Sequence, residues 1–105
     1  MEFLSLREKI LDLLENSNEP LTVDDIIILL ELDPRRKNEI YNHLMHIAKS
    51  IKAKYHGKRK LVMIPPKCKN CGYIFTKLKK AKKPSKCPKC KSMRIEPPSF
   101  MIISH

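Results

Sequence analysis

The chain has 105 residues, of which 42% are hydrophobic, and a formal net charge of +11. This length suits one small domain, or one domain that carries a smaller one, and no apolar run approaches the roughly 18 residues of a membrane-spanning helix. Because no basic and apolar leader with a small-residue cleavage site precedes the first predicted helix, we expect a cytoplasmic protein without membrane contact.

The charge is distributed unevenly along the chain. Residues 1–34 hold two basic and nine acidic residues, whereas residues 35–65 hold nine basic residues against Glu39 alone. Residues 66–95 hold eleven basic residues and no acidic one. A basic surface confined to one part of a protein suits a polyanion such as nucleic acid. Lysines that serve only solubility are the alternative.

The first thirty-two residues predict two helices. Leu6, Ile10, Leu13 and Leu14 follow the spacing of one apolar helix face. Polar residues 16–18 end this helix, and Thr22, with an aspartate three residues later, predicts a capping box for a second helix over residues 23–32.

The second predicted helix contains the continuous apolar run Ile26–Leu30. A single core cannot cover all five side chains of such a run. We therefore expect one or two of them to face the second module or another subunit, as in a homodimer, or a protein partner. Burial of all five within the domain is the alternative.

A third helix is predicted to start at Pro34, with Asp33 as its N-cap, after a gap of about three residues. Such a short gap is typical of a helix-turn-helix. One face of the helix is apolar and is formed by Ile40, Leu44, Ile47 and Ile51.

The opposite face of the third helix is polar, and it carries Arg35, Asn38, Asn42, Met45, His46 and Lys49. Long basic side chains and amides on this helix are the types that bond phosphates and base edges in a major groove. We therefore predict that DNA is contacted by Arg35, Asn38, Asn42, His46 and Lys49. An ordinary solvated face is the alternative, and Glu39 on this face would repel a phosphate.

Two cysteine pairs follow, Cys68-x-x-Cys71 and Cys87-x-x-Cys90, with fifteen residues between them. This spacing predicts a zinc ribbon, in which two turns converge on one tetrahedral ion. Four thiolates fill the coordination sphere, so we expect one structural Zn²⁺, with iron as an alternative. Gly72 suits the positive φ after the first pair, whereas Lys91 stands at the matching point of the second.

The segment between the pairs, TKLKKAKKPSK, holds six lysines and is predicted to be an exposed loop. Contact of this loop with nucleic acid would add affinity without sequence preference. Outside the third helix, the predicted DNA-binding residues are Lys58, Arg59, Lys79, Lys80, Lys82 and Lys83.

The cysteine pairs are flanked by mirrored segments. LVMI at 61–64 runs into Pro65-Pro66, and FMII at 100–103 follows Pro97-Pro98 and a serine. Antiparallel pairing would set the prolines opposite each other and end both strands, because proline cannot donate to a ladder. A hairpin after a helix-turn-helix is the wing of a winged helix.

We therefore predict an α+β fold in two domains. Residues 1–64 plus 99–105 form a winged helix-turn-helix, and residues 65–98 form a zinc ribbon inserted at the tip of the wing hairpin.

The sequence resembles archaeal transcriptional regulators in which a winged helix-turn-helix carries a rubredoxin-like zinc ribbon. The resemblance covers essentially the whole chain, and it rests on EPLTVDDIIILLELDPRRKNEIYNHLMHI, CKNCGY and CPKCKS. It implies double-stranded DNA as the partner and the four cysteines as metal ligands. The chain departs from the pattern at Glu31, where many such turns carry glycine, and at Lys91.

The sequence contains no Ser-His-Asp arrangement, phosphate-binding loop or open metal site, so we expect a protein that is not an enzyme. The leading hypothesis is a DNA-binding transcriptional regulator. A zinc-ribbon interaction module of the transcription machinery and a rubredoxin-like iron electron-transfer protein are the alternatives.

Overall fold

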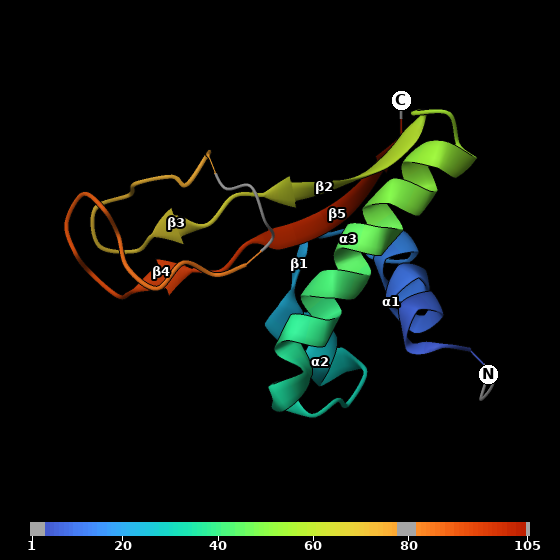
Figure 1. Cartoon of the computed structure of the whole chain (residues 1–105), viewed down its shortest axis with the longest axis horizontal. Coiled ribbons are helices and arrows are strands. Elements are labelled where there is room, and N and C mark those ends of the chain that lie inside the picture. Colours follow the sequence, from blue (N-terminus) through green and yellow to red (C-terminus); the bar gives the residue numbers. More distant parts are fainter. Residues whose placement is uncertain (1–3, 78–81, 105) are drawn as a thin grey trace.

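The structure, a computed structural model, describes residues 4–77 and 82–104. Figure 1 shows the helices grouped at one end, with β3 and β4 projecting from the other. The elements in chain order are α1 (Leu6–Glu15), β1 (Leu21–Thr22), α2 (Val23–Leu29), a 3-10 turn (Pro34–Arg36), α3 (Lys37–Lys54), β2 (Arg59–Ile64), β3 (Lys67–Cys68), β4 (Ile95–Glu96) and β5 (Ser99–Ser104). This is a small mixed α/β fold.

Capping boxes begin the first two helices. In α2 the N–H of Asp25 donates to the Thr22 hydroxyl, and the N–H of Thr22 donates to the Asp25 carboxylate, both at 3.0 Å. This confirms the predicted start of α2. Ser5 and Glu8 exchange the same two hydrogen bonds at the start of α1. Each box satisfies N–H groups that no helical carbonyl can reach.

The predicted end of α2 at residue 32 is wrong, because the helix closes at Leu29. The N–H of Leu32 donates to the carbonyl of Ile27 at 2.9 Å, and the N–H of Glu31 donates to that of Ile28 at 3.3 Å. These two bonds form a Schellman motif, which needs a left-handed residue directly after the C-cap, here Leu30. Glu31 is that residue, with φ of 53°.

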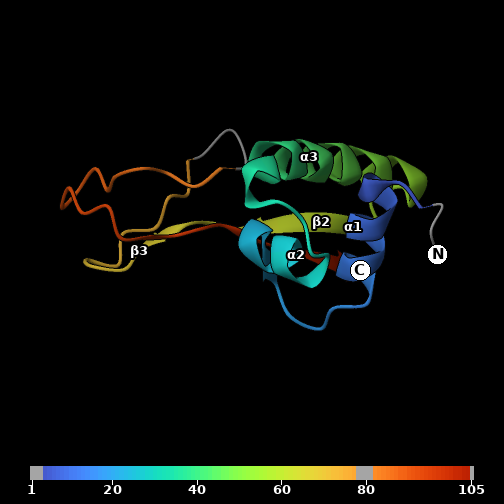
Figure 2. The same ribbon diagram turned by 90° about the horizontal axis from the view of Figure 1, so that it is seen from below.

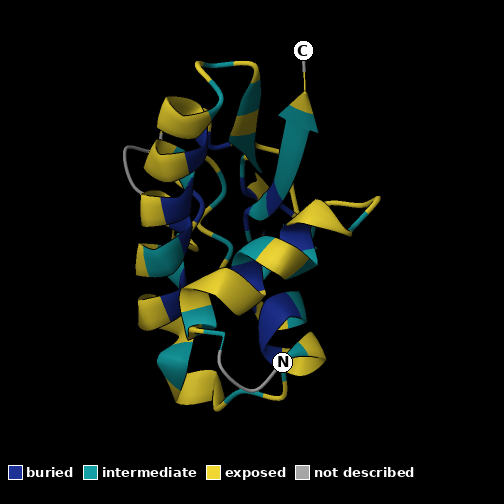
Figure 3. Ribbon diagram, turned by 90° about the vertical axis from the view of Figure 1, so that its right-hand side faces the viewer, coloured by how far each residue is buried: buried dark blue, intermediate teal, exposed yellow. Residues whose placement is uncertain are grey.

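The predicted start of α3 at Pro34 also needs correction. The Asp33 side chain accepts from the N–H of Arg35 at 2.9 Å, and so caps a 3-10 turn over Pro34–Arg36. The α-helix begins only at Lys37. The buried face of α3 matches the predicted apolar stripe, and Figure 3 shows its buried and exposed sides. The stripe consists of Ile40, Leu44, Ile47 and Ile51.

The larger sheet has the order β1-β5-β2, with both pairings antiparallel. Residues 61–64 and 100–103 lie in the paired strands β2 and β5, as predicted, and Leu61 pairs with Ile102. Phe100 lies opposite both Leu21 of β1 and Met63 of β2. Its ring is 3% exposed and meets Tyr41 of α3 edge to face, with the ring centroids 6.3 Å apart. The last strand therefore supplies a central residue of the helical core.

The smaller sheet continues the register of the larger one. Ile64 pairs with Ser99, and the next pair along the hairpin is Lys67 with Glu96. Two residues on each strand lie between these pairs, and all four are prolines. Pro66 and Pro98 are fully buried. The prolines thus interrupt the ladder without shifting it, because they remove donors but keep the strands extended.

Among the described residues, no helix combines the length and the apolar character needed to cross a bilayer.

The strain at Glu31 predicts a stabilising substitution. Glu31→Gly should raise the free energy of unfolding by about 1 kcal/mol, because a β carbon is unfavourable in the left-handed region. Denaturant unfolding of the metal-bound full chain measures the change. Glu31→Ala is the matched control, since it removes the same carboxylate and keeps the β carbon. An equal gain in both variants would attribute the effect to charge and contradict the backbone explanation.

Candidate metal centre and the polar face of the third helix

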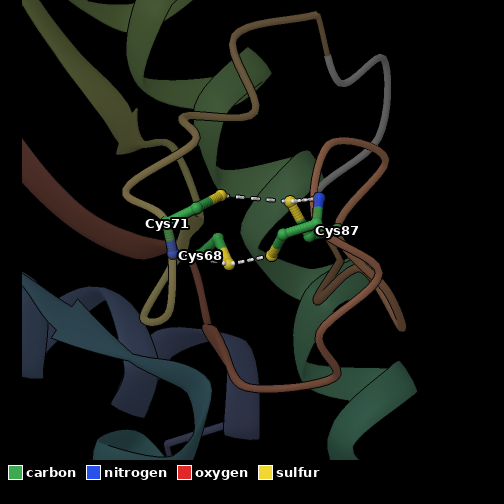
Figure 4. A group of neighbouring side chains, drawn as sticks. Cys68, Cys71 and Cys87 are labelled. Atoms are coloured by element: carbon green, nitrogen blue, oxygen red, sulfur yellow. Dashed lines mark hydrogen bonds between the residues drawn. The ribbon is translucent and has the colours of Figure 1, made fainter.

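The four cysteine sulfur atoms form one cluster at the far end of the molecule. All lie within 4.8 Å of one another, with Cys68 Sγ 3.5 Å from Cys90 Sγ and Cys71 Sγ 3.6 Å from Cys87 Sγ. These separations exclude disulfides, whose S–S distance is about 2.05 Å. Figure 4 shows Cys68 and Cys71 of one turn facing Cys87 of the other. The two pairs converge as predicted.

The cluster has the dimensions of a tetrahedral metal site. A Zn–S bond of about 2.3 Å places the sulfur atoms of a tetrahedron about 3.8 Å apart. The Cys68–Cys90 and Cys71–Cys87 sulfur separations of 3.5 and 3.6 Å are close to this value, and no two of the four sulfur atoms are more than 4.8 Å apart. An S4 tetrahedron suits zinc and also iron. Four thiolates would leave no coordination position for a substrate or water, so the site is suited to a structural role.

Each cysteine pair lies in a turn that stabilises its sulfur atoms. The N–H of Cys71 donates to Cys68 Sγ, and the N–H of Cys90 donates to Cys87 Sγ, both at 3.5 Å. Each turn also contains a bond from the residue after its second cysteine to the carbonyl of its first, at 3.0 Å from Gly72 and 2.9 Å from Lys91. The two turns therefore have the same hydrogen-bond pattern.

The shared turn geometry puts Lys91 in a strained backbone conformation. Gly72 has φ of 81° and Lys91 has φ of 67°, so both turns need a left-handed residue directly after the second cysteine. Glycine adopts this conformation freely, whereas a lysine there costs about 1–2 kcal/mol. The second turn keeps the geometry of the first and is strained at this residue.

The surroundings of the thiols shift the pKa values of Cys90 and Cys71 in opposite directions. The side-chain amide of Asn70, 3.4 Å from Cys90 Sγ, and the N–H of Ser92 lower the pKa of Cys90 to about 6. The N–H of Tyr73 favours ionisation of Cys71, but loss of hydration and the neighbouring thiols raise the pKa of Cys71 to about 12. Without a metal the four thiols cannot all ionise together, so metal binding must release protons.

The ribbon has a very small hydrophobic core. Among the described residues, its hydrophobic core cluster consists of Cys68, Phe75, Cys87 and Ile95, and two of these are candidate metal ligands. Tyr73 adds an edge-to-face contact with Phe75, with the ring centroids 5.0 Å apart. A core of this size cannot hold a segment of some thirty residues without a metal or disulfides.

The side chains predicted for DNA contact on the third helix are all exposed. These are Arg35, Asn38, Asn42, His46 and Lys49. Arg35 is already engaged, because its guanidinium forms an ion pair with Asp33 at 2.8 Å. The exposed face is therefore polar as predicted, but its first cation is paired within the chain.

The remaining predicted DNA-binding residues differ in accessibility. Lys58, Lys82 and Lys83 are exposed, whereas Lys79 and Lys80 lie outside the described residues. Arg59 is half-buried, 3.3 Å from Glu15 of α1, and its guanidinium lies 5.0 Å from the ring centroid of Tyr55. Its Nε atom is buried without a partner among the described residues. Arg59 thus connects β2 to both flanking helices, and its guanidinium does not face solvent freely.

Sequence reasoning did not identify two features of these sites. Asn70 lies between the first two cysteines and donates to a sulfur of the second pair. Glu39 binds Arg36 through two hydrogen bonds of 2.8 Å and lies 3.3 Å from the His43 ring. The i, i+3 spacing of Arg36 and Glu39 and the i, i+4 spacing of Glu39 and His43 indicated their contacts. Nothing in the sequence indicated the hydrogen bond from Asn70 to Cys90.

Metal removal should unfold the ribbon and leave the helical part folded. The helical core is formed by residues outside the ribbon, including Phe100, whereas the ribbon core depends on the cysteines. Chelation should therefore collapse the amide NMR signals of residues 67–77 and 82–96 and preserve those of α1 and α3. Cys68→Ser should reproduce this result, and Ser85→Ala should not. Persistence of dispersed ribbon signals without metal would contradict the prediction.

Comparisons with known proteins match both parts of the chain. Residues 5–61 match the family model described as PF0610-like, N-terminal, and residues 65–105 match the PF0610 rubredoxin-like zinc beta-ribbon domain. A search of curated proteins gave no match. The chain is similar to the solution NMR structure of protein PF0610 from Pyrococcus furiosus, with 30% identity and a TM-score of 0.66. That similarity covers 95% of this chain and 90% of the other. Because the first model spans more than half of the 105 residues, the chain belongs to the PF0610-like family of proteins that carry a rubredoxin-like zinc ribbon.

Proposed function

We propose that this protein is a DNA-binding transcriptional regulator, in which α1, α2, α3 and the β2–β5 hairpin act as a winged helix-turn-helix. In this proposal α3 enters the major groove and the hairpin is the wing. The order of the elements and the tight turn between α2 and α3 support this interpretation.

One observation carries the proposal: cations that lack an acidic partner follow the second half of α3 and the hairpin. Among the described residues, Lys49, Lys52, Lys58 and Lys60 are exposed, and no carboxylate lies within 4 Å of them. A DNA phosphate can contact such a lysine without breaking an ion pair, and each contact releases counterions from the DNA.

The ribbon extends this basic surface. Its described lysines and Arg94 are all exposed, and Figure 1 shows the ribbon continuing the hairpin away from the helices. The longest dimension of the molecule is 44 Å, which exceeds the roughly 34 Å of one DNA turn. In this proposal, with α3 in a major groove, basic side chains of the ribbon contact phosphates beyond that groove. The metal we propose is Zn²⁺, held by Cys68, Cys71, Cys87 and Cys90, and its role is structural.

The exposed side chains divide into two kinds of contact. Amides and imidazoles can bond base edges, and these are Asn38, Asn42 and His46. Lysines bond phosphates without reading sequence, and the described candidates are Lys49, Lys58, Lys82 and Lys83. The engaged guanidinium of Arg59 gives that residue a structural role in this proposal.

Duplex binding over a salt series tests the proposal. The metal-bound protein should bind a random duplex of about 20 base pairs, and log K should fall with log salt by about 0.9 for each phosphate contact. Replacing Arg35, Asn38 and Lys49 together should weaken binding and reduce the salt slope by about one, because Lys49 is the phosphate contact among them. Lys9→Ala on α1 is the matched control. Salt-independent binding, or an unchanged triple variant, would refute the proposal.

A second candidate function, docking on another protein, is favoured by the end of α2. Ile28 is 71% exposed and Leu29 is 56% exposed, whereas the preceding Ile26 and Ile27 are buried in the core. The two exposed side chains line a groove of about 250 Å³ together with Pro20, Leu21 and two carboxylates. Figure 2 places the loop before β1 on the side of the molecule away from α3.

Charge decides which partner suits this groove. Glu19 and Asp25 line it, and Asp24 and Glu31 follow nearby in sequence. A two-fold homodimer across the groove would bring these acids together, and like charges in an interface are unfavourable. A basic and apolar segment of another protein fits better.

The groove predicts binding of a basic amphipathic peptide. A helical peptide of leucine and lysine should shift the amide NMR signals of residues 19–31, and the same peptide with glutamate for lysine should not. Ile28→Ser with Leu29→Ser should abolish the shift. Sedimentation that shows a dimer lost in this variant would favour a second copy and overturn the basic partner.

A further inference from the structure

Three consecutive cations lead from the 3-10 turn into α3, and each is paired with a carboxylate of the same chain. Arg35 Nη2 lies 2.8 Å from Asp33, Arg36 Nε lies 2.8 Å from Glu39, and Lys37 Nζ lies 2.9 Å from Asp24. All six side chains are substantially exposed. In the proposed function, the start of α3 faces the DNA duplex.

The second half of the same helix is different. Lys49, Lys52 and Lys54 are exposed, and none has a carboxylate within 4 Å among the described residues. The positive charge available to a phosphate therefore increases along α3 from its start to its end. A uniform solvated face would not show this polarity.

The geometry of the first two pairs makes them more than random surface contacts. Arg36 donates two parallel hydrogen bonds to Glu39, both of 2.8 Å, and Glu39 also contacts the His43 ring. The Asp33 carboxylate binds the guanidinium of Arg35 and also caps its backbone N–H at 2.9 Å. Hydrogen bonds from Arg36 hold the pKa of Glu39 at about 2, so this carboxylate is ionised at neutral pH.

A phosphate that displaces Asp33 or Glu39 from its arginine gains less free energy than the same contact with an unpaired arginine would give. Exposed ion pairs are individually weak, so a phosphate can compete for either guanidinium. Asp33 is fixed as a cap, however, and its charge would remain beside the phosphate that displaced it. A guanine edge is neutral and offers two acceptors to a guanidinium, so it can replace the carboxylate without that repulsion.

We infer that Asp33 and Glu39 are specificity-determining residues of the DNA-binding face. They keep Arg35 and Arg36 from unselective phosphate contact and release them where base edges accept both guanidinium hydrogen bonds. This inference rests on the proposed function and adds to it the part that discriminates between duplexes.

Charge-neutral substitutions of the two acids test the inference. Asp33→Asn preserves the cap, because asparagine is an equally good N-cap residue, and Glu39→Gln preserves the length of the side chain. Each variant should bind a random duplex roughly fivefold to tenfold more tightly at about 0.1 M salt, with a salt slope steeper by about 0.9. Binding to a duplex selected by the wild-type protein should strengthen less, so the ratio of specific to random affinity should fall.

Two controls separate this mechanism from a change in net charge. Glu19→Gln removes the same charge from the groove beside α2, and should leave the salt slope unchanged. Arg35→Ala should weaken binding of the wild-type protein to its selected duplex, and in the double variant it should cancel the gain of Asp33→Asn on a random duplex. Thermal unfolding confirms that each variant is folded.

The outcomes are distinguishable. If the wild-type protein binds duplex DNA and Asp33→Asn gains nothing, or gains no more than Glu19→Gln, the inference is wrong and the proposed function stands. If neither the wild-type protein nor any variant binds a duplex, the proposed function fails and the inference fails with it.

Discussion

The pairing of β5 with both β1 and β2 is the constraint on which the rest of the structure depends. β5 is the central strand of the larger sheet, yet it is the last element of the chain. Phe100 on this strand is buried among the side chains of the helices and lies opposite residues of both neighbouring strands. The helical part is therefore complete only after the chain has passed through the ribbon and returned. A ribbon placed after β5 would impose no such requirement, because the core would form before it.

The unshifted register across the prolines determines how the two parts are joined. Both sheets belong to one antiparallel hairpin, interrupted where Pro65-Pro66 faces Pro97-Pro98. Closing the 34-residue connection without a metal costs about 3 kcal/mol of entropy beyond a constant, because that cost grows only with the logarithm of length. Such a cost is small beside the burial of a helical core. The metal is thus needed to order the far end of the hairpin, whereas the near end is held by Phe100 and its neighbours.

Local patterns predicted the features that depend on local physics. The apolar stripe of α3, the capping box at Thr22 and the convergence of the cysteines all follow from spacing along the chain, and all are present. The end of α2 could not be predicted, because it depends on Glu31 accepting a left-handed conformation that most residues avoid. The role of Arg59 was equally hidden, since Glu15 lies 44 residues away in sequence and becomes its partner only through packing. The two proline pairs predicted the pairing of strands that lie far apart in the sequence, because a proline ends the hydrogen-bond ladder on both strands of a pair. The helix patterns predicted only local structure.

In the proposed DNA-binding function, helix stability and recognition of DNA compete for the same residues at the start of α3. Carboxylates near a helix N-terminus stabilise the helix dipole, and Asp33 and Glu39 both occupy that region. The same positive end would otherwise attract a phosphate, because unsatisfied N–H groups are natural anion-binding sites. Because its own carboxylates occupy the N-terminus of α3, the chain loses a phosphate contact there that would not depend on DNA sequence. What it keeps is a pair of arginines held in place, and their guanidiniums become available only to an acceptor that replaces a carboxylate with matching geometry. In the proposed function, unselective affinity comes from the other end of α3 and from the hairpin, where the lysines have no carboxylate within 4 Å among the described residues.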